Sequence, residues 1–418
     1  MKKTYKAGLI GKRLKNSYSK EIYTQMFDKI EYKNYVIKTQ EELDDFFEKK
    51  DFDFVNITNP YKKTVIPYLD KISKIVKETG VCNLVIKRKG ILSGYNTDCY
   101  GFKMLLKRHK ISIENKNILI LGNGATSESV LYVINKQNPK SVVVACRNPK
   151  NENQILFKNI DYTLPNIIIN TTPVGNKKSD QPLINIKNFK NLETFIDVIY
   201  EPYRTPTMID AKNEGKGTVG GLTMLIYQAL LAHNFAKGSV HPLFFWEDLR
   251  LRMFLWHTNL VFIGMPTAGK TETCKKIKYI THKNHLDTDK TIETLYKAKI
   301  RTIIKKTSLE NFRAIEVEMI KYIQDAEGLL ISTGGGTVMN EENYRRLARK
   351  GYFIYLKKTN FDDFIDDKKR PLIKSKEDLK IMYKERNPIY EKVADLTVSC
   401  DLTPEEVLEE VTNAIVNS

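Results

Sequence analysis

The chain has few cysteines and no long apolar run. Its 418 residues include only five cysteines, with neither a CxxC pair nor a Cys/His set at metal-ligand spacing. That scatter predicts free thiols in a reducing compartment. No stretch approaches the roughly 18 apolar residues of a membrane helix, and no signal-peptide core follows the basic start. We therefore expect a cytoplasmic protein with no membrane partner.

Acidic residues are fewer than basic ones. The 68 Lys and Arg against 50 Asp and Glu leave a net charge of +18, which would suit phosphorylated ligands or nucleic acid. The basic residues are spread along the whole length among acidic ones, so a lysine-rich solvated surface is the simpler interpretation. Because no fold or motif for base contact accompanies the charge, we expect no nucleic-acid partner.

The apolar segments predict an α/β protein with more than one core. A length of 418 residues favours two or three domains at roughly 150 residues each. Short apolar runs alternate with amphipathic stretches, which favours parallel sheets. Predicted strands lie at residues 6–10, 52–58, 117–121, 141–146, 166–170 and 194–200, and a second series at 260–263, 329–332 and 352–356. A helix at 221–236 precedes an apolar connection at 241–256, for which we expect packing and not a loose tether.

The strongest motif lies in the second series, where residues 264–271 match GxxxxGK[ST] between an apolar strand and a helix. Backbone N–H groups of such a loop converge on phosphate oxygens, its lysine supplies a cation, and its threonine hydroxyl can ligate Mg²⁺. The segment therefore predicts a site for ATP or GTP. The residues expected to hold the nucleotide are Gly264, Thr267, Ala268, Gly269, Lys270 and Thr271.

Further polar residues follow the P-loop in order. Asp287 and Asp289 form a DxD, which can serve a metal and a substrate hydroxyl or can be a solvated loop. Arg313 and Glu316 share a helical face, as ordinary surface pairs also do. A glycine run then ends a strand, and two guanidinium groups come later. These last residues are Gly334, Gly335, Gly336, Arg370 and Arg386.

Together these motifs resemble shikimate kinase over residues 259–418. The resemblance implies that shikimate is held by Asp289, Arg313, the glycine run and Arg386, and guanidinium forks do suit a carboxylate. It also implies that Asp289 accepts the hydroxyl proton, that Asp287 and Thr271 serve Mg²⁺, and that Arg370 covers the phosphates from a lid. Departures are Thr267, Glu272 and a short segment before Arg370.

A second glycine turn lies in the first half, between the strand at 117–121 and a helix. It lacks the third glycine of a dinucleotide fingerprint, so the turn alone does not decide whether a dinucleotide binds there. Arg147 ends the next strand, with Asn148 beside it, and a cation there suits the 2′-phosphate of NADP better than the ribose hydroxyls of NAD. The turn residues are Gly122, Asn123, Gly124, Ala125 and Thr126.

Lys62 follows a strand, and Asp98 follows the segment Gly-Tyr-Asn-Thr. Such a pair is usually a surface salt bridge, but in a cleft under a nicotinamide it could move a proton to or from a ketone. With the glycine turn, these segments resemble shikimate dehydrogenase over residues 6–235. The other matching segments are 17–19, 58–62, Asn83, 96–98, 170–175 and 221–228.

This second resemblance implies a two-subdomain dehydrogenase at 1–250, with a substrate subdomain at about 1–97 and 221–240 and a Rossmann-type NADP subdomain at 98–220, followed by the P-loop kinase domain at 258–418. It implies Lys62 and Asp98 as the catalytic pair, Tyr200 near the substrate and Gly221 near the nicotinamide. Departures are Leu84, Ala125 and Glu128. The residues implied to bind shikimate are Ser17, Ser19, Thr58, Asn83 and Gln228.

The sequence therefore predicts a bifunctional enzyme that reduces 3-dehydroshikimate with NADPH and phosphorylates shikimate with Mg·ATP, its partners being these small molecules. An alternative is a shikimate kinase whose N-terminal half senses shikimate or a nucleotide without catalysis, which the departures in the glycine turn motivate. The sequence leaves the oligomeric state and the choice between shikimate and quinate open.

Overall fold

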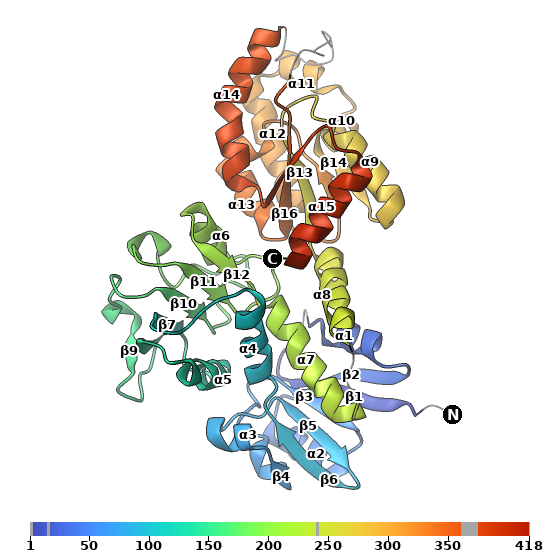
Figure 1. Ribbon diagram of the computed structural model, residues 1–418. Coiled ribbons are helices and arrows are strands. Elements are labelled where there is room, and N and C mark those ends of the chain that lie inside the picture. The colour runs from blue at the N-terminus through green and yellow to red at the C-terminus, as the bar shows by residue number, and fades with distance from the viewer. Residues whose placement is uncertain (1–2, 15–16, 240–241, 361–374, 418) are drawn as a thin grey trace. The chain divides into compact units, whose positions relative to one another are not determined.

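The chain folds into two compact units. The computed structural model describes residues 3–14, 17–239, 242–360 and 375–417. One unit comprises Met1–Glu201 and Asp210–Met253, and the other comprises Pro202–Ile209 and Phe254–Ser418. Each unit combines helices with sheets that are wholly or partly parallel (Figure 1). Within the described ranges, no helix is both long and apolar enough to cross a membrane.

The first sheet of the N-terminal unit is mixed. Its order is β2-β1-β3-β5-β6-β4. The strand β1 runs parallel to β3 as predicted, and also to β2, a strand that the sequence did not predict. The expectation of a parallel sheet is wrong for β5, which runs antiparallel to both β3 and β6, whereas β4 runs parallel to β6. Lys89 and Gly90 join β5 to β6 with positive φ angles of 50° and 81°, and such two-residue turns connect antiparallel strands. The strands are β1 (Tyr5–Gly11), β2 (Ile30–Val36), β3 (Phe54–Ile57), β4 (Lys71–Ile72), β5 (Leu84–Arg88) and β6 (Ile91–Tyr95).

The second sheet of this unit is entirely parallel, in the order β12-β11-β10-β7-β8-β9. From β7 the chain adds β8 and β9 on one side, and it then returns to add β10, β11 and β12 on the other side of β7. Ligands bind at the carboxyl ends of the strands at such a switch point, here between β7 and β10. The glycine turn follows β7 and therefore lies there. The strands are β7 (Asn117–Leu121), β8 (Ser141–Cys146), β9 (Gln154–Leu156), β10 (Ile167–Asn170), β11 (Thr194–Asp197) and β12 (Gly217–Val219).

Helices cover both sheets of this unit. Figure 1 shows α4 and α7 side by side. The predicted return of the helix at 221–236 to the first sheet is confirmed, because Ile226 and Leu230 of α7 pack in one core with Ala7 and Phe54. The helices of this unit are α1 (Ser19–Met26), α2 (Gln40–Lys49), α3 (Lys74–Thr79), α4 (Asp98–Arg108), α5 (Ala125–Ile134) and α7 (Leu222–Lys237). The helix α6 (Pro206–Asn213) is divided between the two units after Ile209.

The apolar connection is a helix, α8 (Leu243–His257). Trp246, Leu249 and Met253 are buried in the same core as α7, so the expectation of packing is confirmed for them. Their spacing of three and four residues places them on one face of the helix. Phe244 on α8 is 73% exposed.

The C-terminal unit has one parallel sheet, ordered β14-β15-β13-β16-β17. All five residues of the central strand β13 are buried. Its strands are β13 (Asn259–Ile263), β14 (His285–Asp287), β15 (Leu330–Ser332), β16 (Gly351–Lys357) and β17 (Leu396–Ser399). Its helices are α9 (Lys270–Thr281), α10 (Thr288–Leu295), α11 (Ile300–Lys306), α12 (Leu309–Ile323), α13 (Glu341–Ala348), α14 (Lys376–Val393) and α15 (Pro404–Asn417).

Packing of α8 predicts a stability difference between two substitutions on that helix. Leu249 is fully buried, so Leu249→Ala should lower the free energy of unfolding of the N-terminal unit by about 2–5 kcal/mol. Urea unfolding followed by the fluorescence of buried Trp246 measures it. Exposed Phe244 provides the matched control, and Phe244→Ala should change the same quantity by less than about 0.5 kcal/mol. Equal effects would contradict the packing.

Candidate active sites

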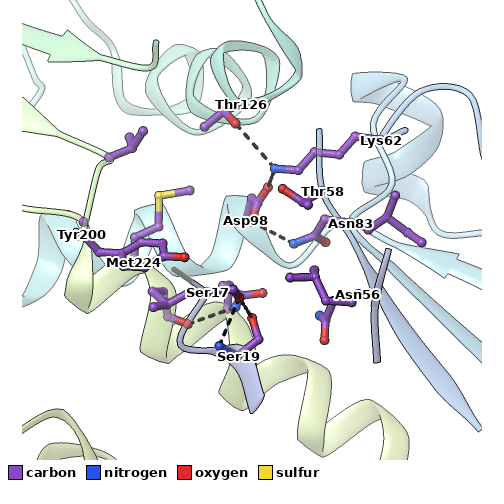
Figure 2. Close-up of a pocket in the computed structure, with 16 residues that line it drawn as sticks. Ser17, Ser19, Asn56, Thr58, Lys62, Asn83, Asp98, Thr126, Tyr200 and Met224 are labelled. Carbon is purple, nitrogen blue, oxygen red and sulfur yellow. Dashed lines mark hydrogen bonds and ion pairs between the residues drawn. The ribbon is translucent and has the colours of Figure 1, made fainter. Parts of the chain in front are cut away.

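A pocket of about 200 Å³ opens in the N-terminal unit (Figure 2). It brings together residues from β3, α4, α5, α7 and the loops before α1 and after β11. The residues predicted from the sequence that line it are Ser17, Ser19, Thr58, Lys62, Asn83, Asp98, Thr126, Tyr200, Gly221 and Gln228. Those that the sequence did not predict are Leu9, Asn56, Ile57, Val198, Met224 and Leu225.

A buried ion pair lies at the centre of this pocket. Lys62 Nζ is 2.7 Å from Asp98 Oδ2, and the two side chains are only 13% and 10% exposed. Asp98 begins α4, where the helix N-terminus favours a negative charge. Its other oxygen, Oδ1, accepts a hydrogen bond of 2.8 Å from Asn83 Nδ2. Lys62 Nζ also donates to Thr126 Oγ1 at 3.5 Å. The alternative of a surface salt bridge is therefore wrong for Lys62 and Asp98.

Neutral polar groups make up the rest of the wall. Asn83 Oδ1 accepts from the backbone N–H of Thr97 at 2.7 Å, and Thr97 Oγ1 donates to Gln228 Oε1 at 3.2 Å, which fixes both amides. Ser17 Oγ donates to Ser19 Oγ at 3.1 Å. Figure 2 shows these two serines across the pocket from Lys62. Hydroxyls and amides of this kind suit a small polyhydroxylated ligand.

Tyr200 adds an aromatic wall. Its ring lies 5.1 Å from that of Tyr18, and burial raises the pKa of its hydroxyl above the ordinary value. Its hydroxyl therefore stays protonated over the physiological range. The neighbouring Glu201 accepts a hydrogen bond of 2.6 Å from the Tyr18 hydroxyl.

Two residues that the sequence reasoning missed carried a detectable signal. Asn56 is a buried polar residue inside the apolar strand β3, and its Oδ1 accepts from the Tyr32 hydroxyl at 3.2 Å. A lone amide in an apolar strand is a candidate ligand or hydrogen-bond partner. Met224 lies four residues before Gln228 on α7, and this spacing puts both side chains on one face of the helix.

The glycine turn fits a pyrophosphate group. Gly122 has a φ of +96°, and a Cβ there would lie 2.7 Å from Thr172 Cγ2. Gly124 is the residue before α5, and a Cβ on it would meet no atom within 4 Å. A ligand can therefore approach the backbone at the start of α5, and the first N–H groups of a helix, which have no partner within the helix, bind phosphate. Ala125, where the resemblance to shikimate dehydrogenase expects a glycine, already begins α5, so this departure leaves the turn intact.

The remaining cofactor residues lie beside the turn. Arg147 and Asn148 follow β8 and are exposed, and Asn123 Nδ2 donates to the Asn148 carbonyl at 3.0 Å. The acidic departure at Glu128 is compensated, because its Oε1 lies 3.3 Å from Lys63 Nζ. Gly221 precedes α7, and a Cβ there would come within 2.1 Å of the Val198 carbonyl oxygen.

A second, larger pocket of about 700 Å³ lies in the C-terminal unit. Gly264 and Ala268 are part of the P-loop but do not line this pocket, and Arg370 lies outside the described residues. The predicted residues that line it are Thr267, Gly269, Lys270, Thr271, Asp287, Asp289, Arg313, Gly334, Gly335, Gly336 and Arg386. Additional lining residues include Lys290, Glu293, Ile300, Ile304, Phe312, Glu316 and Met382.

The P-loop joins β13 to α9. Lys270 Nζ donates to the carbonyls of Gly264 and Met265, both at 2.9 Å, so its charge lies against the loop. Thr271 Oγ1 donates to Asp287 Oδ2 at 2.7 Å. Thr267 takes a φ of +75°, which explains why glycine would be easier there.

The Thr271 hydroxyl and the Asp287 carboxylate fit Mg²⁺. Among the described residues, no three His, Cys, Asp or Glu side chains gather as a metal cage. Mg²⁺ typically uses one or two carboxylates together with substrate phosphates and waters, and the paired hydroxyl and carboxylate match that need. These two residues would hold the ion.

Asp289 and the pair Arg313–Glu316 form the acceptor side of this pocket. Burial, together with the negative charges of Glu316 and Asp287, raises the pKa of Asp289 to about 6. Arg313 Nη1 is 2.7 Å from Glu316 Oε2, and the Glu316 side chain is 1% exposed. The alternative of an ordinary surface pair is therefore wrong for Arg313 and Glu316. Thr337 Oγ1 donates to the other oxygen of Glu316 at 2.6 Å.

The glycine run lets these side chains share one loop. A Cβ on Gly334 would lie 2.5 Å from Asp289 Oδ1, and a Cβ on Gly336 would lie 2.3 Å from Arg313 Nη2. Arg386 Nη1 donates to the Gly335 carbonyl at 3.0 Å. Two guanidinium groups and a carboxylate therefore surround the backbone of residues 334–336.

Comparisons with known proteins agree with both pockets. A family model described as shikimate dehydrogenase substrate binding domain matches residues 9–85, and one described as shikimate kinase matches residues 266–416. An NADP(+) shikimate dehydrogenase of Clostridium botulinum is 32% identical over 246 residues, which cover 54% of this chain and 95% of that protein.

Solved structures extend the likeness to the fold of the N-terminal unit. Shikimate dehydrogenase 1 of Peptoclostridium difficile is 29% identical, with a TM-score of 0.55 over 60% of this chain and 98% of that one. A chorismate mutase/shikimate 5-dehydrogenase fusion protein of Clostridium acetobutylicum is 26% identical, with a TM-score of 0.56 over 60% and 97%. The chain thus belongs to the shikimate dehydrogenase family and carries a shikimate kinase domain behind the dehydrogenase.

Proposed function

We propose that this chain reduces 3-dehydroshikimate to shikimate with NADPH in its N-terminal unit and phosphorylates shikimate with Mg·ATP in its C-terminal unit. The observation that carries the proposal is the presence, in one chain, of two pockets with groups suited to a hydroxylated acid. The first pocket reaches the glycine turn only through Thr126, since Gly122, Asn123, Gly124 and Ala125 do not line it, and the second is lined by residues of the P-loop. We propose the boundary between the two enzymes within residues 250–258.

The residues of the first pocket have separate roles in ketone reduction. When bound beside the glycine turn, NADPH supplies the hydride. Lys62, held by Asp98 at 2.7 Å, presents a cation and a proton to the oxygen that becomes an alkoxide. Ser17 and Ser19 donate to the substrate carboxylate, while Asn83, Thr58 and Gln228 bind its hydroxyls. Tyr200 closes the pocket, and Gly221 leaves room for the nicotinamide.

The residues of the second pocket serve phosphoryl transfer. When bound at the P-loop, Mg·ATP supplies the phosphoryl group. Asp289, with its raised pKa, orients the acceptor hydroxyl and accepts its proton. Arg313 and Arg386 bind the shikimate carboxylate as bidentate cations, and Lys270 stabilises the transferred charge. We keep Arg370 as the residue that covers the phosphates.

A reductase is favoured over a ligand-sensing N-terminal unit. Binding alone would need the hydroxyl and amide groups but not a buried Lys–Asp pair, whose desolvation is costly. That pair is complete in this pocket, and the charge of Glu128 is compensated by Lys63.

A cytoplasmic location fits the five free cysteines.

Two substitutions should separate the activities. Lys62→Ala removes the proton donor and should slow NADPH oxidation with 3-dehydroshikimate by about 100-fold or more, while phosphorylation of added shikimate is retained. Lys270→Ala should slow phosphorylation by a similar factor of about 100 and leave NADPH oxidation intact. Absorbance at the NADPH band and a coupled assay for ADP measure the two rates. Loss of both activities in either variant would refute the division into two sites.

The glycine run predicts a selective loss of shikimate affinity. In Gly336→Ala the new methyl would displace the Arg313 guanidinium, because the Cβ would lie 2.3 Å from its Nη2. Loss of one charge-assisted contact should raise the KM for shikimate in the kinase reaction by about 10-fold. The KM for ATP in the same assay is the internal control and should not change. An unchanged KM for shikimate would place Arg313 outside the acceptor site.

A further inference from the structure

Gln154, the first residue of β9, accepts three hydrogen bonds at the edge of the nucleotide sheet. Its Oε1 accepts from Asn123 Nδ2 at 3.1 Å and from the backbone N–H of Lys150 at 3.0 Å, and the Cys146 thiol donates to it at 3.7 Å. An amide oxygen has two lone pairs, so this acceptor is fully used. Nothing in the motifs of the chain assigns Gln154 a role.

These bonds connect two loops that bind different parts of a dinucleotide. Asn123 lies between the glycines of the pyrophosphate turn, and its Nδ2 also donates to the Asn148 carbonyl at 3.0 Å. The backbone N–H of Gln154 donates to the Asn151 carbonyl at 3.0 Å, which closes the loop from the other end. The segment 147–150 is thereby tied to the glycine turn through Asn123 and Gln154.

The tied segment carries two cations. Arg147 and Lys150 are exposed, and within the described part of the chain neither forms an ion pair with an acidic side chain. Their charges are available to an anion at the carboxyl end of β8. The amide of Gln154 holds this loop without adding a negative charge near that anion.

We propose that Gln154 is a positioning residue that sets the preference of the dehydrogenase for NADPH over NADH. Its side chain keeps the segment 147–150 at a fixed distance from the glycine turn. When the pyrophosphate lies on the turn, Arg147 and Lys150 then meet the ribose 2′-phosphate without first ordering the loop. The proposal rests on the proposed assignment of NADPH to this site, and it adds the group that arranges the site.

Two substitutions of Gln154 in the full-length chain test it. Gln154→Met keeps the length but removes the acceptor, and it should raise the KM for NADPH by about 10-fold, the effect of one lost charge-assisted contact. The KM for NADH should not change, because NADH has no 2′-phosphate. The kcat values with NADPH and NADH should not change either, because Gln154 does not line the substrate pocket. Gln154→Glu keeps the acceptor and adds a negative charge, so it should also raise the KM for NADPH alone. The Ki of 2′,5′-ADP as a competitor of NADPH should rise in parallel.

Controls separate positioning from general damage. Gln137 donates only to the Val133 carbonyl at the end of α5 among the described contacts, and Gln137→Met should change neither KM. An unchanged kcat and KM with NADH in each preparation report that the N-terminal unit is folded.

Two results would overturn the role of Gln154. The first is a Gln154→Met variant whose KM rises equally for NADPH and NADH, and the second is one that leaves both unchanged. If the wild-type chain itself failed to oxidise NADPH with 3-dehydroshikimate, the proposed function would be wrong instead. The two failures are therefore distinguishable.

Discussion

Burying a charged side chain costs free energy, and both active sites contain buried charged groups. One site pairs the buried charges with each other, and the other raises the pKa of a buried carboxyl group. In the first site, Lys62 and Asp98 are buried together, and Asn83 donates a hydrogen bond to the second oxygen of the Asp98 carboxylate. The attraction between the two groups offsets part of the cost of removing them from water. In the second, the nearest charges to Asp289 include two further carboxylates, and its pKa rises to about 6. A fixed cation suits a developing alkoxide, whereas a carboxylate with a raised pKa suits proton transfer near neutral pH.

The two pockets would also recognise one acid with different chemistry. The first uses neutral hydroxyls and amides such as Ser17, Ser19 and Gln228, and its fixed cation is reserved for the reacting carbonyl. The second places Arg313 and Arg386 around the glycine run. There the substrate must share a cavity with the carboxylates of Asp287 and Asp289 and with nucleotide phosphates. A second guanidinium offsets that negative charge, which neutral donors alone would not.

Local motifs predicted much of this molecule from the sequence. The strands β7 and β13, the P-loop and the glycine turn follow from apolar runs that end in glycine, because those signals lie within a few residues of one another. The strand β8 follows from an apolar run that ends before Arg147. The helix α8 and the antiparallel β5–β6 pair did not follow, since a Lys-Gly turn and an apolar connection each allow several structures. The surface interpretations of Lys62 and Arg313 were wrong because burial depends on which distant segments cover a side chain. Asn56 and Glu316 line the two pockets for the same reason, since distant segments of the chain fold over them.

Net charge explains less of the function than the placement of a few cations. Every substrate proposed for this chain is an anion, and an excess of +18 would in principle attract all of them. At physiological ionic strength, however, charges farther than about 8 Å from a ligand are largely screened. Most lysines of a spread distribution lie beyond that distance from any one pocket. NADPH and NADH differ by one phosphate, so selectivity between them must come from cations that are held in place. A neutral residue such as Gln154 affects this selectivity only by fixing the positions of those cations.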